Sequence, residues 1–301
     1  MTDVRYRNAG LAAGAVVAVA AVVLLSLNTS GPLTPAKAIV LGAVEGFTEY
    51  LPVSSTGHLL VTQRLLGLGE GDAKAAADTY AIAIQIGAIL AVVVLFWRRL
   101  GQLASGMIGR DIDGRRLLVR LIIAFVPAAA VGVLLGDSIK DRLFGPWPVV
   151  AAWLVGGFFL VWWNPRPGRI DLTSFTVRHA AIIGAAQILA LWPGMSRSLV
   201  TIAAALAIGA SMSAAVEFSF LLGLATLSAA TLFDLAKDGQ TLLDDYGWRT
   251  PLLGGIVAFI TAVIAVRWLV AFLRTRPLSI FGWYRIGIAA ATVVMIATGV
   301  I

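Results

Sequence analysis

The chain has no cysteine and only two histidines, His58 and His179, among its 301 residues. Without cysteine it forms no disulfide and offers no thiolate as a nucleophile or metal ligand. Two histidines are too few for the ligand sets typical of zinc sites. Charged residues are also scarce, at 13% of the chain, which is roughly half their share in soluble domains. These absences argue against a soluble protein and exclude cysteine-based chemistry.

Apolar residues fill the chain instead, with 59% hydrophobic residues and a mean hydropathy of +0.90. Several apolar runs approach the ~20 residues that a membrane-spanning helix requires. The composition therefore predicts an all-α polytopic membrane protein. The net charge of +7 indicates no nucleic-acid partner, because most arginines lie in short loops between apolar runs, as in cytoplasmic loops of membrane proteins. The candidate spans are 11–27, 78–97, 117–135, 149–163, 213–233, 251–273 and 279–301.

The first candidate span follows two arginines, Arg5 and Arg7, and this order of charge and apolar run also occurs in signal peptides. The stretch with the shape of a cleavage site, residues 36–38, already adjoins a polar segment. We therefore expect span 11–27 to be retained, within an N-terminal segment of residues 1–35.

Two segments of about 30 residues, 36–68 and 179–209, carry polar and charged residues and are interrupted by Pro52 and Pro193. Ionisable groups are costly in lipid and usually mark function there. Non-helical backbone at membrane depth is tolerated only where protein or a watery cavity surrounds it. We interpret each segment as a re-entrant hairpin of two half-helices, which enters and leaves the membrane on the same side.

Loop charge agrees with this interpretation. With a cytoplasmic N-terminus and two hairpins that do not cross, every basic loop, including the most basic one at 98–116, lies inside and the acidic loop 234–250 lies outside. The hairpins then enter from opposite faces. The letters GAVE at 42–45 parallel GAAQ at 184–187, and the breaks at Pro52 and Pro193 are expected to correspond as well. This pattern predicts an inverted repeat, residues 36–163 and 179–301, each with one hairpin and three spans. In transporters with this plan, the broken helices meet near the bilayer midplane.

The first hairpin holds two carboxylates, Glu45 and Glu49, four residues apart and hence on one helical face. In a poorly hydrated site such a pair either retains a proton or binds a divalent cation. The alternative is a structural hydrogen-bonding pair that seals the hairpin.

Small polar residues follow the break in the first hairpin and precede His58. They suit the N-cap of a second half-helix, whose exposed N–H groups favour phosphate, and His58 on its first turn is a candidate base, acid or nucleophile. For any single hydroxyl, capping alone is the simpler explanation. These residues are Ser54, Ser55, Thr56 and Gly57.

The second hairpin contributes a cation. Arg197 stands between Ser196 and Ser198 and follows Gly194, where a second half-helix is expected to begin. A guanidinium suits bidentate binding of phosphate, although Arg197 would also serve simply as an ion-pair partner for Glu45 or Glu49. Both half-helix N-termini would then face one anion, and we expect Gly194, Ser196 and Ser198 to bind it.

Other polar residues within the spans have weaker claims to function. Gln85 and Glu217 occupy corresponding spans of the two halves, where they either line the cavity or join helices by hydrogen bonds. His179 borders a basic loop, which indicates an interfacial position. Three arginines near predicted cytoplasmic ends are expected to extend towards the headgroups: Arg120, Arg267 and Arg285.

The chain resembles the undecaprenyl-diphosphate phosphatases, the bacterial bacitracin-resistance membrane family, in four motifs. They are EGFTEYLPVSSTGHL at 45–59, IQIGAILAVVVLFWRRL at 84–100, LALWPGMSRS at 189–198 and AAVEFSFLL at 214–222. The resemblance extends from about residue 36 to the C-terminus. It implies an integral enzyme of the bacterial plasma membrane that removes the terminal phosphate from undecaprenyl diphosphate. The product, undecaprenyl phosphate, is the lipid carrier of cell-wall precursors. It also implies a site open to the outer face and dependence on Mg²⁺ or Ca²⁺.

The same resemblance implies roles for matching residues. Glu45 and Glu49 form the acidic, metal-binding pair, and Arg197 stabilises the phosphate with Ser196. We favour Ser55 as the nucleophile, activated by Glu49 or His58; attack by His58 or by water stays open. The resemblance implies a polyprenyl diphosphate and membrane lipids as partners, and it allows a second copy of the chain as the partner in a homodimer. The alternative function is a transporter or flippase of a phosphorylated lipid or anion, built on the same inverted repeat.

Overall fold

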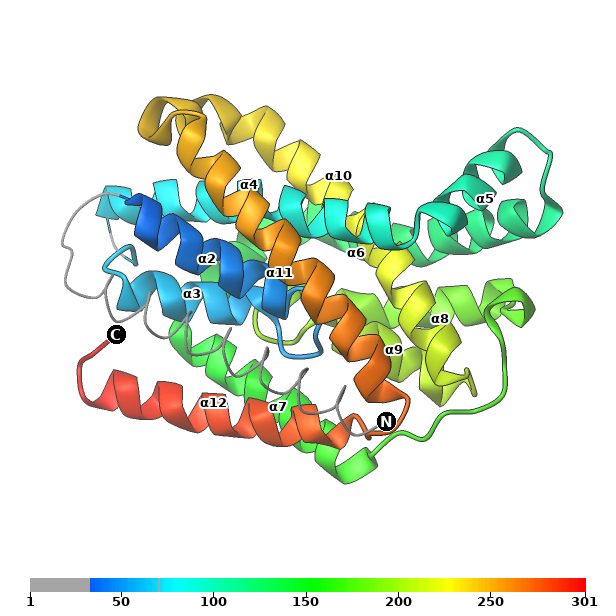
Figure 1. The fold of residues 1–301 in the computed structure, drawn as a ribbon. Coiled ribbons are helices and arrows are strands. Elements are labelled where there is room, and N and C mark those ends of the chain that lie inside the picture. Colours follow the sequence, from blue (N-terminus) through cyan, green and yellow to red (C-terminus); the bar gives the residue numbers. More distant parts are fainter. Residues whose placement is uncertain (1–32, 70) are drawn as a thin grey trace, which may run out of the picture.

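The computed structural model describes residues 33–69 and 71–301, with the backbone alone for 71–76, 238–239 and 241–246. The expected span 11–27 lies outside the described residues. Helices dominate the described part of the chain, which contains no β-strand, so the prediction of an all-α protein is confirmed (Figure 1). Its helices are α2 (Pro35–Thr48), α3 (Ser55–Leu65), α4 (Gly71–Leu95), α5 (Trp97–Met107), α6 (Ile112–Leu143), α7 (Pro146–Trp163), η1 (Leu172–Ser174), α8 (Val177–Gln187), η2 (Ile188–Leu191), α9 (Arg197–Ala207), α10 (Met212–Tyr246), α11 (Arg249–Leu273) and α12 (Ser279–Ala297).

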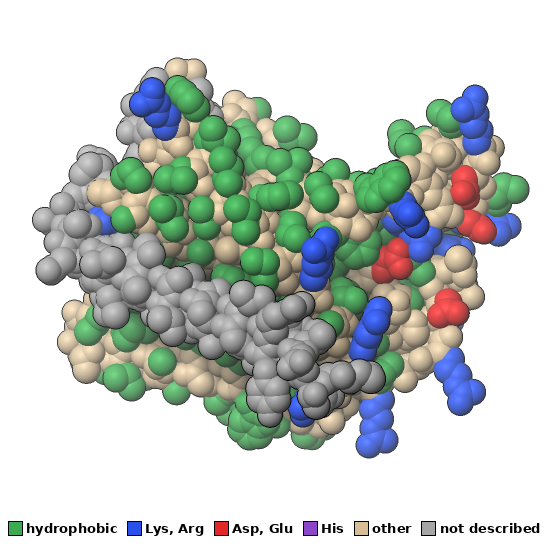
Figure 2. All heavy atoms as spheres, viewed as in Figure 1, with side chains coloured by type: hydrophobic (Ala, Val, Ile, Leu, Met, Phe, Trp, Pro, Cys, Tyr) green, Lys and Arg blue, Asp and Glu red, His purple; other side chains and the backbone are tan. Residues whose placement is uncertain are grey.

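Six of these helices are long and apolar enough to cross a membrane: α4, α6, α7, α10, α11 and α12. They coincide with the six predicted spans that lie in the described residues, and the protein is a multi-pass membrane protein. Helix α11 shows the expected lipid-facing surface, because apolar side chains four residues apart, from Leu252 to Ile264, are each about half exposed. Figure 2 shows hydrophobic side chains spread over this side of the molecule, while most visible Lys and Arg side chains gather at the end that carries α5.

Two segments predicted as loops are helical. Residues 98–116 contain α5, a short helix that packs on the first turns of α6 and projects from the bundle (Figure 1). Glycines permit this close contact, because a Cβ on Gly106 or Gly114 would overlap the backbone of the other helix. The acidic stretch 234–250 is mostly a continuation of α10 to Tyr246. Both segments are rich in charged residues, which suggested loops. An amphipathic or solvent-exposed helix carries charged residues equally well.

Each hairpin packs against a helix from the other half of the chain. Helix α2 lies along α11, and α8 lies along α6; the remaining long helices pair as α4 with α10 and α7 with α12 (Figure 1). Close contact again depends on glycine: a Cβ on Gly42 would overlap Gly254 of α11, and a Cβ on Gly184 would lie 2.6 Å from the Ala124 carbonyl of α6. The two halves of the chain therefore interlock.

The two hairpins share one backbone plan at a constant distance of 142 residues. Thr34 and Thr176 cap the first half-helices and accept from N–H groups three residues on. Ser54 and Ser196 cap the second half-helices, both with φ 74°. Glycines in left-handed conformation end them, Gly67 with φ 69° and Gly209 with φ 90°.

This spacing changes one alignment made from the sequence. The breaks at Pro52 and Pro193 were expected to correspond, but the backbone pairs Pro52 with Gly194, while Pro193 corresponds to Leu51. The letters GAVE and GAAQ keep the predicted correspondence, so Glu45 matches Gln187.

Candidate active site

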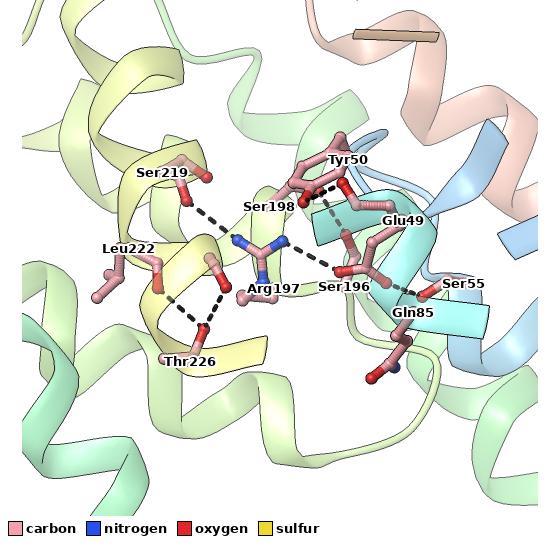
Figure 3. Close-up of polar contacts among 12 residues, drawn as sticks. Glu49, Tyr50, Ser55, Gln85, Ser196, Arg197, Ser198, Ser219, Leu222 and Thr226 are labelled. Carbon is pink, nitrogen blue, oxygen red and sulfur yellow. Dashed lines mark hydrogen bonds and ion pairs between the residues drawn. The ribbon is translucent and has the colours of Figure 1, made fainter. Parts of the chain in front are cut away.

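The two hairpins meet at an ion pair between Glu49 and Arg197. Glu49 follows the last residue of α2, and Arg197 is the first residue of α9. Arg197 Nη2 lies 3.1 Å from Glu49 Oε1, with 11% and 5% of the side chains exposed (Figure 3). Both groups are nearly removed from water, so their attraction is screened far less than at a surface. The pair joins residues that are 148 positions apart in the chain.

The second oxygen of the Glu49 carboxylate accepts a hydrogen bond from Ser55. Ser55 Oγ donates to Glu49 Oε2, and Ser55 is itself 6% exposed, at the first turn of α3 (Figure 3). One carboxylate thus bridges a hydroxyl of the first hairpin and a guanidinium of the second. A buried hydroxyl beside a carboxylate is the arrangement of a nucleophile and its base.

Helix α10 fixes the position of Arg197. Arg197 Nη1 donates to the Ser219 carbonyl at 3.0 Å, and the guanidinium carbon lies 5.8 Å from the centre of the Tyr50 ring. A Cβ on Gly223 would overlap Nη1, so only glycine leaves room for the guanidinium there. Figure 3 shows Arg197 between Ser219 on one side and Glu49 on the other.

The serines that flank Arg197 tie the two turns together. Ser198 Oγ donates to the Leu51 carbonyl at 2.7 Å, and Ser196 Oγ lies 3.4 Å from the same carbonyl. Ser196 also caps α9 by accepting from the Leu199 N–H. These serines, predicted as phosphate ligands, are already engaged in holding the hairpins in contact.

Small residues at the start of α3 serve the local fold. Ser54 Oγ accepts from the Gly57 N–H at 3.4 Å, which caps the helix. Gly57 faces Trp153 of α7, where a Cβ would lie 2.8 Å from the indole ring. Thr56, in the first turn of α3, is half-buried.

Glu45 lies one helical turn before Glu49 and is fully buried. Neither oxygen of its carboxylate has a hydrogen-bond partner among the described residues. Gln187, at the corresponding place in the second hairpin, is 2% exposed, and its amide oxygen and nitrogen also lack partners. Buried polar atoms without partners are uncommon, so these two sites require an explanation.

His58 is bound to groups outside the cluster of Glu49, Ser55 and Arg197. Its Nδ1 lies 2.7 Å from the Ser54 carbonyl, to which it must donate, and Nε2 then accepts from the Tyr284 hydroxyl at 2.8 Å. The imidazole stacks on the Tyr284 ring and meets Trp153 edge-on.

The family comparisons agree with these observations. The family model described as "Bacitracin resistance protein BacA" matches residues 38–291. The chain belongs to this family. It is 46% identical over 260 residues to an undecaprenyl-diphosphatase of Sorangium cellulosum, covering 84% of this chain and 83% of that protein. It is also 38% identical to an undecaprenyl-diphosphatase of Nitrobacter hamburgensis, over 87% of this chain and 97% of that one.

Of the two alternatives open for Gln85 and Glu217, the structure shows contacts that join helices. Gln85 Oε1 accepts from Thr231 at 3.1 Å, which links α4 to α10. Glu217 pairs with Arg99 of α5 at 2.6 Å and borders a separate cavity of about 360 Å³.

Arg285 was expected to extend towards the headgroups, and this prediction is wrong. Arg285 belongs to α12, and its side chain is fully buried and donates to the backbone carbonyls of Ala152 and Gly194. Sequence reasoning also gave no role to Tyr284, Trp153 or Gly223. The sequence does show Arg285 as a charged residue within an apolar span. Its hydrogen-bond acceptors are backbone carbonyls, however, and because every residue has one, the sequence does not show which carbonyls Arg285 binds.

Proposed function

We propose that the chain is an integral membrane phosphatase that hydrolyses undecaprenyl diphosphate to undecaprenyl phosphate and inorganic phosphate. The product is a lipid carrier, so the reaction would recycle it for cell-wall synthesis. The observation that carries the proposal is the Glu49 carboxylate, which contacts Ser55 with one oxygen and Arg197 with the other. The names of the relatives supply the substrate class.

In the proposed reaction Ser55 is the nucleophile. Its Oγ forms a bond to the terminal phosphorus while the bond between that phosphorus and the bridging oxygen breaks. Glu49 accepts the hydroxyl proton and passes it to the departing undecaprenyl phosphate. Water then attacks the phosphoserine and gives a proton to Glu49, and Ser55 recovers its proton as inorganic phosphate leaves. Ser55 is favoured over His58 because only Ser55 contacts Glu49.

Arg197 would stabilise the charge that develops on the transferred phosphoryl group. A guanidinium already fixed by Ser219 needs little reorganisation when the substrate binds, and preorganised charge of this kind is a major source of catalysis. The N-terminus of α9, where Arg197 lies, adds backbone N–H groups that favour an anion. If a phosphate oxygen of the substrate replaced Glu49 as the partner of Arg197, substrate binding would free the Glu49 carboxylate to act as the base.

A divalent cation fits this site. The buried Glu45 carboxylate has no hydrogen-bond partner in the described part of the chain, and a cation held by Glu45 and Glu49 would remove the cost of burying it. The described residues contain no group of three His, Cys, Asp or Glu side chains suited to a metal. This suits Mg²⁺, which is commonly held by one or two carboxylates together with substrate phosphates. When bound, such a cation neutralises phosphate charge.

The proposed membrane arrangement is the inverted repeat, with both hairpins re-entrant, in the bacterial plasma membrane. Support comes from the shared backbone plan of the hairpins and from their exchanged packing, α2 on α11 and α8 on α6. The basic residues near α5 and α8 favour a cytoplasmic position for that end. The opening of the site to the outer face is proposed from the family resemblance.

Phosphate release from purified protein tests the proposal. Wild-type protein in detergent, with undecaprenyl diphosphate and Mg²⁺ or Ca²⁺, is expected to release inorganic phosphate, and chelation of the cation should abolish it. Ser55→Ala and Arg197→Ala should lose the activity. The matched controls are Asp113→Asn and Arg267→Met, whose side chains are exposed and belong to segments other than 36–68 and 179–209. Absence of release by the wild type, or full activity of Ser55→Ala and Arg197→Ala, would contradict the assignment.

A further inference from the structure

Arg285 is a buried cation in a membrane-spanning helix that binds no carboxylate. It lies in α12 with no exposed surface, and among the described residues no ion pair includes it. Its Nε also lacks a hydrogen-bond partner. A buried and unneutralised charge is costly in a membrane protein, and residues of this kind usually serve function. The question is what Arg285 does for the hairpins beside it.

Its hydrogen bonds reach both hairpin turns. Nη2 donates to the Gly194 carbonyl at 2.8 Å, and Nη1 lies 3.4 Å from the Pro52 carbonyl. These two carbonyls are the corresponding positions of the two hairpins, 142 residues apart. Each stands two residues before the capping serine of its hairpin.

The two carbonyls also lie at the same sequence distance from the proposed reactive groups. Pro52 precedes Ser55 by three residues, and Gly194 precedes Arg197 by three. Arg285 therefore holds the same point of each turn, just ahead of the proposed nucleophile and the proposed phosphate ligand. A planar guanidinium with diverging donors can satisfy acceptors on two separate segments at once, which a lysine ammonium does less well.

Helix α7 provides the space for this arrangement. Nη2 also donates to the Ala152 carbonyl of α7 at 2.8 Å, and a Cβ on Gly156 would overlap Nη2 and lie 2.9 Å from Cζ. Helices α7 and α12 approach closely at Gly157, next to Gly156, and at Gly282, three residues before Arg285. Helix α7 also contacts the turn of the first hairpin directly, because Trp153 Nε1 donates to the Val53 carbonyl at 2.9 Å.

From this geometry we infer that Arg285 is a positioning residue, which holds corresponding carbonyls of both hairpin turns and so sets the separation between Ser55 and Arg197. The inference rests on the proposed phosphatase function. Arg285 contacts no reactive group, so its loss should act through Ser55 and Arg197. Misplacement of catalytic groups by about 1 Å can cost on the order of 10²-fold in rate.

The test compares kcat, KM and thermal unfolding of folded, monodisperse variants with the wild type. Arg285→Met should lower kcat about 10²-fold while KM changes less than threefold, because the turns shift but the substrate surface stays. Arg285→Lys should recover part of the lost kcat. A purely structural role would lower the melting temperature without changing kcat per folded molecule.

Gly156→Ala offers a second route that keeps the charge. The added methyl group displaces the flexible end of Arg285 from the carbonyls, so kcat should fall at unchanged KM. Gly287→Ala on α12, where a Cβ meets nothing within 4 Å, and Arg267→Met on α11 are the matched controls and should behave as wild type. Should Arg285→Met not fold, Gly156→Ala decides the matter. A kcat within twofold of wild type in folded Arg285→Met or Gly156→Ala overturns the inference, whereas an inactive wild type overturns the phosphatase function and this role with it.

Discussion

The two hairpins have the same frame but different contents. The caps, the turn conformation and the ends of the second half-helices correspond at a distance of 142 residues. The ends of the first half-helices differ, because α2 continues to Thr48 while α8 ends at Gln187 and is followed by the short helix η2. The side chains at four corresponding positions differ in the chemistry they permit. In the first hairpin they are Glu45, Glu49, Ser55 and His58; in the second they are Gln187, Leu191, Arg197 and Val200. The two hairpins thus share a backbone plan, but the first hairpin carries the two carboxylates and the second carries the cation.

This division explains how the halves are held together without a large charged interface. Among the described residues, Glu49 and Arg197 form the ion pair that joins the two hairpins. It is supported by the bonds from Ser198 to the Leu51 carbonyl and from Arg285 to both turns. The first hairpin is bound further by His58 to Tyr284. Substitutions at corresponding positions therefore separate what the frame requires from what the chemistry requires.

The largest difference is expected between Glu49→Gln and Leu191→Gln, which place the same amide at corresponding positions. Glu49→Gln removes the proposed base and the partner of Arg197, so kcat should fall by about 10³-fold or more. Leu191→Gln adds a polar group where no carboxylate existed, and kcat should stay within about fivefold. Phosphate release at saturating substrate measures both. Equal losses in the two variants would show that the carboxylate has no special role.

The second comparison concerns the space left for Arg197. Gly223→Ala puts a methyl group where Nη1 now lies, so the guanidinium must leave Ser219 or Glu49. We expect kcat to fall on the order of 10–100-fold, less than on removal of the cation itself. Gly255→Ala on α11, where a Cβ meets nothing within 4 Å, is the control and should be unchanged. Wild-type kcat in folded Gly223→Ala would mean that the position of Arg197 does not limit the reaction.

A third change makes the hairpins alike. Glu45→Gln gives both the same residue, and it removes a buried carboxylate that lacks a partner. The cation concentration for half-maximal activity should rise on the order of 10–100-fold, as when support of a metal site is lost. Without added cation the variant should unfold at a higher temperature than the wild type, because an unpaired buried charge has been replaced by a neutral group. Titration with Mg²⁺ and thermal unfolding under chelation measure the two effects, and a variant that is less stable without cation would count against a metal at Glu45.

The sequence predicted the chemistry of this site better than its supports. Glu49, Ser55 and Arg197 were predictable, because polar residues in an apolar chain are conspicuous and the topology brings their segments together. The helices α5 and the extended α10 were missed, because charged residues were assigned to loops. The backbone acceptors of Arg285 and the space left by Gly223 were not predictable, since both depend on three-dimensional contacts between residues far apart in the chain.

The fourth prediction concerns His58, whose counterpart Val200 carries no ionisable group. Because His58 binds Ser54 and Tyr284, His58→Phe should lower kcat only about tenfold, by loosening the turn before Ser55. Tyr284→Phe removes the same hydrogen bond and should cost about threefold, and the double variant should be no worse than His58→Phe, as expected for residues that act together. Steady-state kinetics of the three variants decide it. A loss as large as that of Glu49→Gln, with Tyr284→Phe unaffected, would instead make His58 the nucleophile or base.

The smallest effects are expected where the hairpins are identical, at the capping serines. Ser54 and Ser196 share φ 74°, a left-handed conformation that glycine adopts without strain, while each hydroxyl accepts a weak N–H bond of 3.3–3.4 Å. Ser54→Gly and Ser196→Gly each lose a cap but relieve strain, and Ser196→Gly also loses the 3.4 Å contact with the Leu51 carbonyl, which Ser198 retains. Their free energies of unfolding should therefore change by less than about 1 kcal/mol. Ser54→Ala and Ser196→Ala lose the cap without that relief, and each should be destabilised by a further ~1 kcal/mol. Thermal unfolding of the four variants measures this, and similar values at 54 and 196 would show that the frame is energetically as well as geometrically duplicated. A marked difference between the two glycine variants would mean that one turn depends on its serine for more than a cap.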